Sequence, residues 1–76
     1  MHVTILSRLY GRPERVAAIV RVVNGEVQIE HLDTPPLKIE AQVQGIRAMY
    51  PNEEAFLKAL AFDLKGSYVI GSFHRE

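Results

Sequence analysis

The sequence contains no cysteine in its 76 residues. This absence excludes disulfide bonds, thiol catalysis and every zinc site that uses a cysteine ligand, and it is compatible with a reducing cytoplasm. The fold must therefore rest on a core built from the hydrophobic positions, which are 47% of the chain. So short a chain leaves a large share of its surface exposed, and oligomerisation is a common way to bury more of it.

The sequence also lacks a long hydrophobic run. No apolar stretch approaches the roughly 18 residues that a membrane-spanning helix needs. Residues 1–9 have neither the basic start nor the cleavage pattern of a secretory signal. We therefore expect a soluble, cytoplasmic protein with no membrane partner.

Neither sign of charge predominates, because nine basic residues offset nine acidic ones. The two signs are nevertheless separated along the chain. Residues 1–25 carry four arginines and one glutamate, whereas residues 26–76 carry five basic and eight acidic residues. Such asymmetry can mark an anionic partner or head-to-tail self-association. The simpler alternative is an ordinary solvated surface on which Arg21 pairs across a hairpin.

The strongest structural signal is the dipeptide Asn24-Gly25, which separates two strand-like runs. Asparagine and glycine accept the positive φ of a two-residue type I′ turn, so this dipeptide predicts a hairpin of strands over 15–23 and 26–32. Side chains alternate between the two faces of a strand, which divides the hairpin into a core face and a solvent face. The predicted core face carries Val16, Ala18, Val20, Val22, Val27 and Ile29. The predicted solvent face carries Arg15, Arg21, Glu26, Gln28 and Glu30.

The hairpin register also places His31 at the end of the core face, opposite Ala18. An imidazole there could titrate near physiological pH. The simpler interpretation is a histidine at the edge of the core that is satisfied by one hydrogen bond.

The remaining pattern predicts an α+β domain over residues 1–76. Residues 3–9 predict a first strand, which forms an antiparallel three-stranded meander with the hairpin. Residues 37–50 fit a strand by alternation and a helix by composition, and we favour a helix broken near Gly45. The helical alternative has an apolar face of Ile39, Val43, Ile46 and Tyr50. Residues 68–73 predict a short C-terminal strand. We expect this sheet to pack against one or two helices.

A helix is predicted over residues 53–65, with Asn52 as its N-cap and Lys65-Gly66 as its stop signal. Its apolar side chains extend well past half of its circumference. They are Ala55, Phe56, Leu57, Ala59, Leu60, Phe62 and Leu64. A helix this apolar usually packs on more than one neighbour, which favours a homodimer.

The search for catalytic chemistry assigns no catalytic, cofactor-binding or metal-binding residue. His2, His31 and His74 have no spacing that would aim two rings at one metal ion. Residues 66–71 contain the G-x-x-x-x-G part of a phosphate loop, but no lysine follows it. We interpret these glycines structurally, as a helix C-cap at Gly66 and a tight approach or bulge at Gly71.

Four residues around the first predicted loop are candidates for contact with an anion or a nucleic acid: Arg8, Tyr10, Arg12 and Arg15. Guanidinium groups neutralise phosphates, and an exposed tyrosine offers a surface on which bases stack. Nucleic-acid-binding domains are usually basic overall, which this chain is not.

Three segments resemble a loose group of short uncharacterised bacterial proteins. They are residues 52–60 (N-E-E-A-F-L-K-A-L), residues 66–68 (G-S-Y) and residues 11–18 (G-R-P-E-R-V-A-A). The proteins of this group end in a similar F-L-x-A-L helix and G-S-Y strand. The resemblance implies an α+β domain and a bacterial origin, and it carries over no functional residue. The sequence thus favours a homodimeric, non-enzymatic interaction or regulatory module, with a nucleic-acid-binding module as the alternative.

Overall fold

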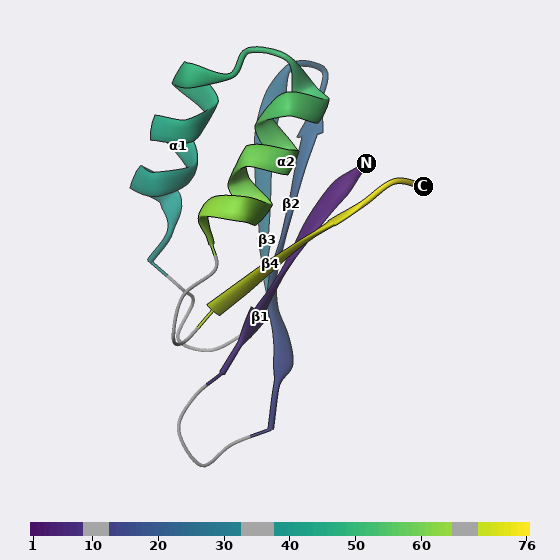
Figure 1. The fold of residues 1–76 in the computed structure, drawn as a ribbon, viewed down its shortest axis with the longest axis vertical. Helices are drawn as coiled ribbons and strands as arrows, with labels where there is room; N and C mark the ends of the chain where they lie inside the picture. The colour runs from purple at the N-terminus through teal and green to yellow at the C-terminus, as the bar shows by residue number, and fades with distance from the viewer. Residues whose placement is uncertain (9–12, 33–37, 65–68) are drawn as a thin grey trace.

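Four strands and two helices make up the described chain. The computed structural model describes residues 1–8, 13–32, 38–64 and 69–76. In chain order its elements are β1 (His2–Ser7), β2 (Arg15–Val23), β3 (Glu26–His31), α1 (Glu40–Met49), α2 (Glu53–Asp63) and β4 (Val69–His74) (Figure 1). The expected loop contacts of Tyr10 and Arg12 and the stop signal Lys65-Gly66 lie outside the described residues.

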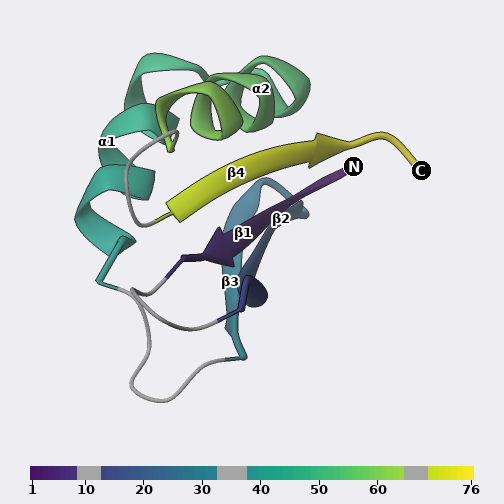
Figure 2. The same ribbon diagram turned by 60° about the horizontal axis from the view of Figure 1, so that its bottom comes forward.

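The strands form one antiparallel sheet in the order β3-β2-β1-β4. This order confirms the predicted meander, and β4 adds to it as the predicted C-terminal strand. Both helices lie on one face of the sheet (Figure 2). The other face, which we call the open face, has no helix over it among the described residues.

The hairpin has the predicted turn and register. Asn24 and Gly25 have φ angles of 51° and 81°, as a type I′ turn requires. Val20 pairs with Ile29, and His31 lies opposite Ala18.

The predicted core face is wrong at Val16. Ile5 pairs with Ala18 but Leu6 pairs with Val16, so Ala17 is an extra residue in β2. A bulge of this kind reverses the alternation of side chains beyond it. Val16 therefore shares the open face with its partner Leu6 and is 38% exposed, whereas Ala17 is fully buried. Arg15, predicted on the solvent face, pairs with the buried Ser7 and so lies on the helix side of the sheet, although it is exposed at the strand end.

The segment that fitted both patterns is helical, and the predicted break near Gly45 is wrong. α1 continues through Gly45, which costs only about 1 kcal/mol relative to alanine. Val43 on one side of the glycine is buried, and Ile46 on the other side packs against the core. These contacts hold the helix against the core on both sides of the glycine.

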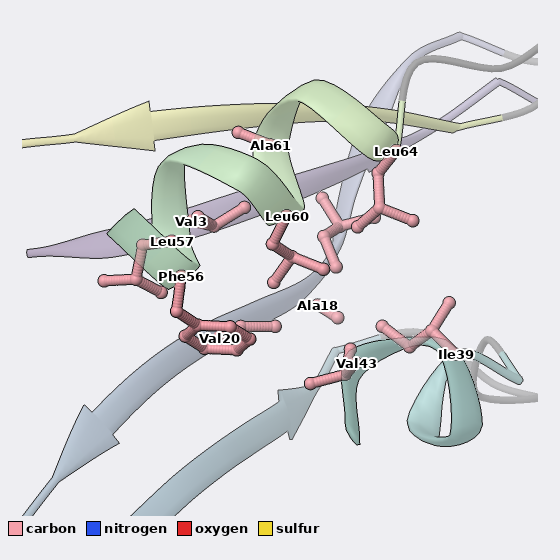
Figure 3. Packing of buried hydrophobic residues seen from close by; sticks show 11 residues of the cluster. Val3, Ala18, Val20, Ile39, Val43, Phe56, Leu57, Leu60, Ala61 and Leu64 are labelled. Carbon is pink, nitrogen blue, oxygen red and sulfur yellow. The ribbon is translucent and has the colours of Figure 1, made fainter. Parts of the chain in front are cut away.

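α2 has the predicted N-cap, because the Asn52 side chain accepts a hydrogen bond of 3.0 Å from the backbone N–H of Ala55. The helix ends at Asp63, with Leu64 as its C-cap, two residues before the predicted end. Within the core, Phe56 and Leu60 of α2 pack with Val20 of β2 (Figure 3).

The tight approach predicted at Gly71 is confirmed. A Cβ atom at this position of β4 would lie 2.9 Å from the Cα atom of Ala61 in α2. The absence of a side chain therefore lets the helix lie directly on the strand.

Candidate functional site

The structure describes two of the four arginine-cluster residues. Arg8 follows β1 and Arg15 begins β2, so both lie at the same end of this strand pair. The Nε atom of Arg8 donates a hydrogen bond of 2.7 Å to Glu14, which offsets its charge. Tyr10 and Arg12 are outside the described residues. Nucleic-acid contact by this cluster stays a prediction.

Arg21 has the cross-strand partner expected of a solvated sheet surface. Its Nη1 atom lies 3.6 Å from an oxygen of Glu30 on β3. Both side chains are substantially exposed, so water weakens this attraction.

His2 and His74 face each other across the β1–β4 pair on the open face. Their rings stack with centroids 4.8 Å apart and planes 16° apart. Ring nitrogens offer their lone pairs in the ring plane, so two nearly parallel rings cannot converge on one metal ion. Instead, the Nδ1 atom of His2 contacts the Glu76 carboxylate, and the Nε2 atom of His74 lies 2.9 Å from the Thr4 hydroxyl. Among the described residues, no group of three or more His, Asp or Glu side chains could hold a metal ion.

His31 makes one side-chain hydrogen bond, as predicted, but this bond does not satisfy the whole ring, because the Nδ1 atom is buried without a hydrogen-bond partner among the described residues. Its Nε2 atom donates to the Glu40 carboxylate at 3.1 Å and so joins β3 to the first turn of α1. The backbone N–H of Glu40 lowers the pKa of this carboxyl below its ordinary value, partial burial opposes the shift, and His31 adds to the lowering. This contact positions the start of α1 over the edge of the sheet.

The most distinctive surface feature is a groove between the two helices. It has a volume of about 430 Å³. We call it the helix-pair groove and define it by Ile46, Met49 and Tyr50 at the end of α1 and by Lys58, Ala59, Phe62 and Asp63 on α2. Met49 is 72% exposed and Phe62 is 74% exposed. Large apolar side chains exposed on this scale are typical of interaction surfaces when they gather in one patch.

The α1 side of the groove is held by Arg47. Its guanidinium donates hydrogen bonds to the carbonyl oxygens of Pro51 at 3.0 Å, Tyr50 at 3.4 Å and Gly25 at 3.4 Å. It also lies 5.3 Å from the centre of the buried Phe56 ring. Arg47 thereby joins the end of α1, the connection to α2 and the hairpin turn. This network holds the backbone at Tyr50, which follows Met49 in the chain.

The α2 side of the groove has one charge of each sign. Asp63 accepts a hydrogen bond of 2.6 Å from Gln42 of α1, which bridges the helices. Lys58 lies 3.8 Å from Glu54, one turn earlier on α2. The groove therefore has an apolar centre and a rim that is neutral in sum.

The apolar surplus of α2 pointed to Ala59 and Phe62 in advance. The contribution of Met49 was missed, because the helical face recognised in residues 37–50 did not include it. The signal that could have found it is its place three residues after Ile46 on the same helix.

Neither α1 nor α2 combines the length and apolar character needed to cross a membrane. Comparisons of the chain with protein-family models, with curated proteins and with solved structures give no match.

Proposed function

We propose that this protein is a non-enzymatic, cytoplasmic interaction module of bacterial origin that self-associates through the helix-pair groove. The observation that carries this proposal is the exposure of Met49 and Phe62 on opposite sides of one groove. Each side chain leaves about three quarters of its surface in water in the isolated chain. Burial of such side chains is worth about 1.5 to 3 kcal/mol each.

The lining chemistry supports binding. The groove offers thioether, aromatic and aliphatic side chains, and the enrichment of methionine and aromatic residues is characteristic of protein interfaces. Tyr50 adds a hydroxyl group that can donate at the rim of an apolar contact. Lys58 and Asp63 supply the polar rim that surrounds the apolar centre of many interfaces.

A second copy of the chain is the occupant that the charges favour. The formal net charge of the protein is zero, so two copies do not repel each other as a whole. The groove rim carries one positive and one negative side chain, so it can complement itself. A strongly acidic or basic partner would find no matching excess of charge there.

The expected dimer is weak. A standard interface covers about 800 Å² on each partner, which is about one sixth of the 5000 Å² accessible surface of this chain. Two helices of 10 and 11 residues provide an interface at the small end of this range. Association in the micromolar range is therefore expected.

Sedimentation velocity across micromolar to submillimolar concentrations tests the proposal. The apparent mass of the wild type should rise from 8.6 kDa toward twice that value. Phe62→Ser and Met49→Ser should each shift this rise to higher concentration. Leu32→Ser is the matched control, because Leu32 is also apolar and 52% exposed but lies outside the groove. A wild type that stays at 8.6 kDa throughout would refute self-association.

A further inference from the structure

The α2 side of the helix-pair groove has an internal symmetry. Its four lining residues are Lys58, Ala59, Phe62 and Asp63. The outer pair is Lys58 and Asp63, and the inner pair is Ala59 and Phe62. Both pairs have the same midpoint in the sequence, between Leu60 and Ala61. Reversal of the helix about this midpoint exchanges Lys58 with Asp63 and Ala59 with Phe62.

Resting on the proposed self-association, we infer that two copies pair with their α2 helices antiparallel, about a two-fold axis that crosses α2 between Leu60 and Ala61. An interface of this kind is isologous. If one residue of the first copy contacts a second residue of the partner, then that second residue of the first copy contacts the first residue of the partner. Lys58 then lies opposite Asp63 of the other copy, twice per dimer. Ala59 lies opposite Phe62 of the other copy, also twice.

Both exchanges are complementary. The outer one pairs an ammonium group with a carboxylate on each side of the axis. The inner one sets a small side chain against a large ring, so the ring of each Phe62 gains space above the other helix. A parallel arrangement would instead bring Lys58 against Lys58 and Phe62 against Phe62. Like charges in direct contact disfavour that alternative.

The spacing suits a short helix crossing. Lys58 and Asp63 are five residues apart, which is about 7.5 Å along the helix axis. The two ion pairs therefore flank an apolar centre that is about two side chains wide. Met49 and Tyr50 of α1 border this centre and extend the contact beyond α2.

The contacts already made within one copy are compatible with this pairing. Asp63 uses its Oδ2 atom for the hydrogen bond from Gln42, and an ionised carboxylate accepts several hydrogen bonds. Lys58 is 3.8 Å from Glu54 and its Nζ atom lies 5.6 Å from the centre of the Phe73 ring, but its side chain is exposed and its ammonium group has three donors. Both groups can keep their present partners while they meet across the axis.

Charge reversal tests the geometry. Lys58→Glu places two carboxylates opposite each other in a homodimer, and Asp63→Lys places two ammonium groups opposite each other. Each variant alone should dimerise about tenfold more weakly than the wild type, since surface pairs contribute modestly and two are reversed. An equimolar mixture of the two variants should restore the wild-type affinity, because both contacts are then complementary. The doubly substituted Lys58→Glu/Asp63→Lys protein should also restore it as a homodimer.

The outcomes separate the geometry from the self-association itself. A wild type that dimerises while the mixture stays as weak as the single variants would overturn the antiparallel α2 pairing and leave self-association standing. Single variants that dimerise as tightly as the wild type would overturn it as well. A monomeric wild type would refute the self-association and, with it, the pairing. Urea melts of each variant distinguish a loss of dimer from a loss of fold. The double variant is a further control for folding, because it carries both substitutions in one chain and should still dimerise.

Discussion

Two phenylalanines on the same helix should lose very different amounts of folding stability on truncation. Phe56 is completely buried beside Val20, with the Arg47 guanidinium over its ring. Phe56→Ala should cost about 3 to 5 kcal/mol, because it removes a buried ring and leaves a cavity. Total stability for a chain of 76 residues is roughly 4 to 11 kcal/mol. The Phe56 variant should therefore lose a large share of the stability of the domain.

Phe62→Ala is the matched substitution, because the residue type and the helix are the same but Phe56 is buried and Phe62 is 74% exposed. It should change the stability of the single chain by about 0.5 kcal/mol, as expected for a surface position, and it should weaken the dimer. Urea unfolding at low protein concentration measures the first effect, and sedimentation measures the second. A typical slope of about 1 kcal/mol per molar urea converts the loss at Phe56 into a midpoint shift of about 3 to 5 M. Equal midpoints for Phe56→Ala and the wild type would refute the assignment of this helix face to the core.

Three further predictions follow from other contacts. Gly71→Ala should destabilise by about 1 to 3 kcal/mol, because the new Cβ would meet the backbone of Ala61, whereas Gly45→Ala meets nothing within 4 Å and should stabilise α1 by about 1 kcal/mol in the same urea melts. Arg47→Met keeps an unbranched side chain but removes the donors, so thermal melts should show a loss of about 1 to 3 kcal/mol in folding stability. Arg47→Lys should not restore this stability, because a single ammonium group cannot span the carbonyl oxygens that the guanidinium reaches. The hydrogen bond from His2 lowers the pKa of Glu76 below its ordinary 4.5. The stability that this contact adds is therefore present above pH 4.5 and is lost as pH falls through the lowered pKa. Glu76→Gln should flatten this part of the curve of unfolding free energy against pH, and an unchanged curve would contradict the contact.

The hairpin was predictable because its determinants are local. A two-residue turn that needs positive φ fixes the register of every pair beyond it. The same locality explains the N-cap at Asn52, where one side chain serves the next turn of the helix. The hairpin strands and α2 were therefore predicted with accurate starts, although α2 ends two residues before the predicted end.

The bulge at Ala17 was not predictable, because it depends on how β2 meets β1 rather than on β2 alone. The alternating pattern of residues 15–23 continues through this position without a visible interruption. Only the pairing of Leu6 with Val16 shows that one residue has been passed over. A shift of this kind exchanges the faces of the residues beyond it, here Val16 and Arg15, while the composition stays the same.

The helix-pair groove was also predictable only in part. The sequence indicated that α2 carries more apolar surface than one sheet can bury, but the side chains that stay exposed depend on where α1 lies. That position is set by contacts over long distances in the chain: Glu40 with His31 at one end of α1, and Arg47 with Gly25 at the other. Both anchors join α1 to the hairpin of β2 and β3, which we call the β3 hairpin.

These anchors have a consequence for binding. Because both ends of α1 are tied to the β3 hairpin, α1 does not cover the outer side of α2, and Phe62 stays exposed in the single chain. A surface fixed in this way before contact loses little conformational freedom on association, which favours binding through a small area. The anchors should therefore influence dimerisation without touching the partner. Loss of the Arg47 contacts would weaken the dimer by freeing Met49 and Tyr50, even though Arg47 itself does not line the groove.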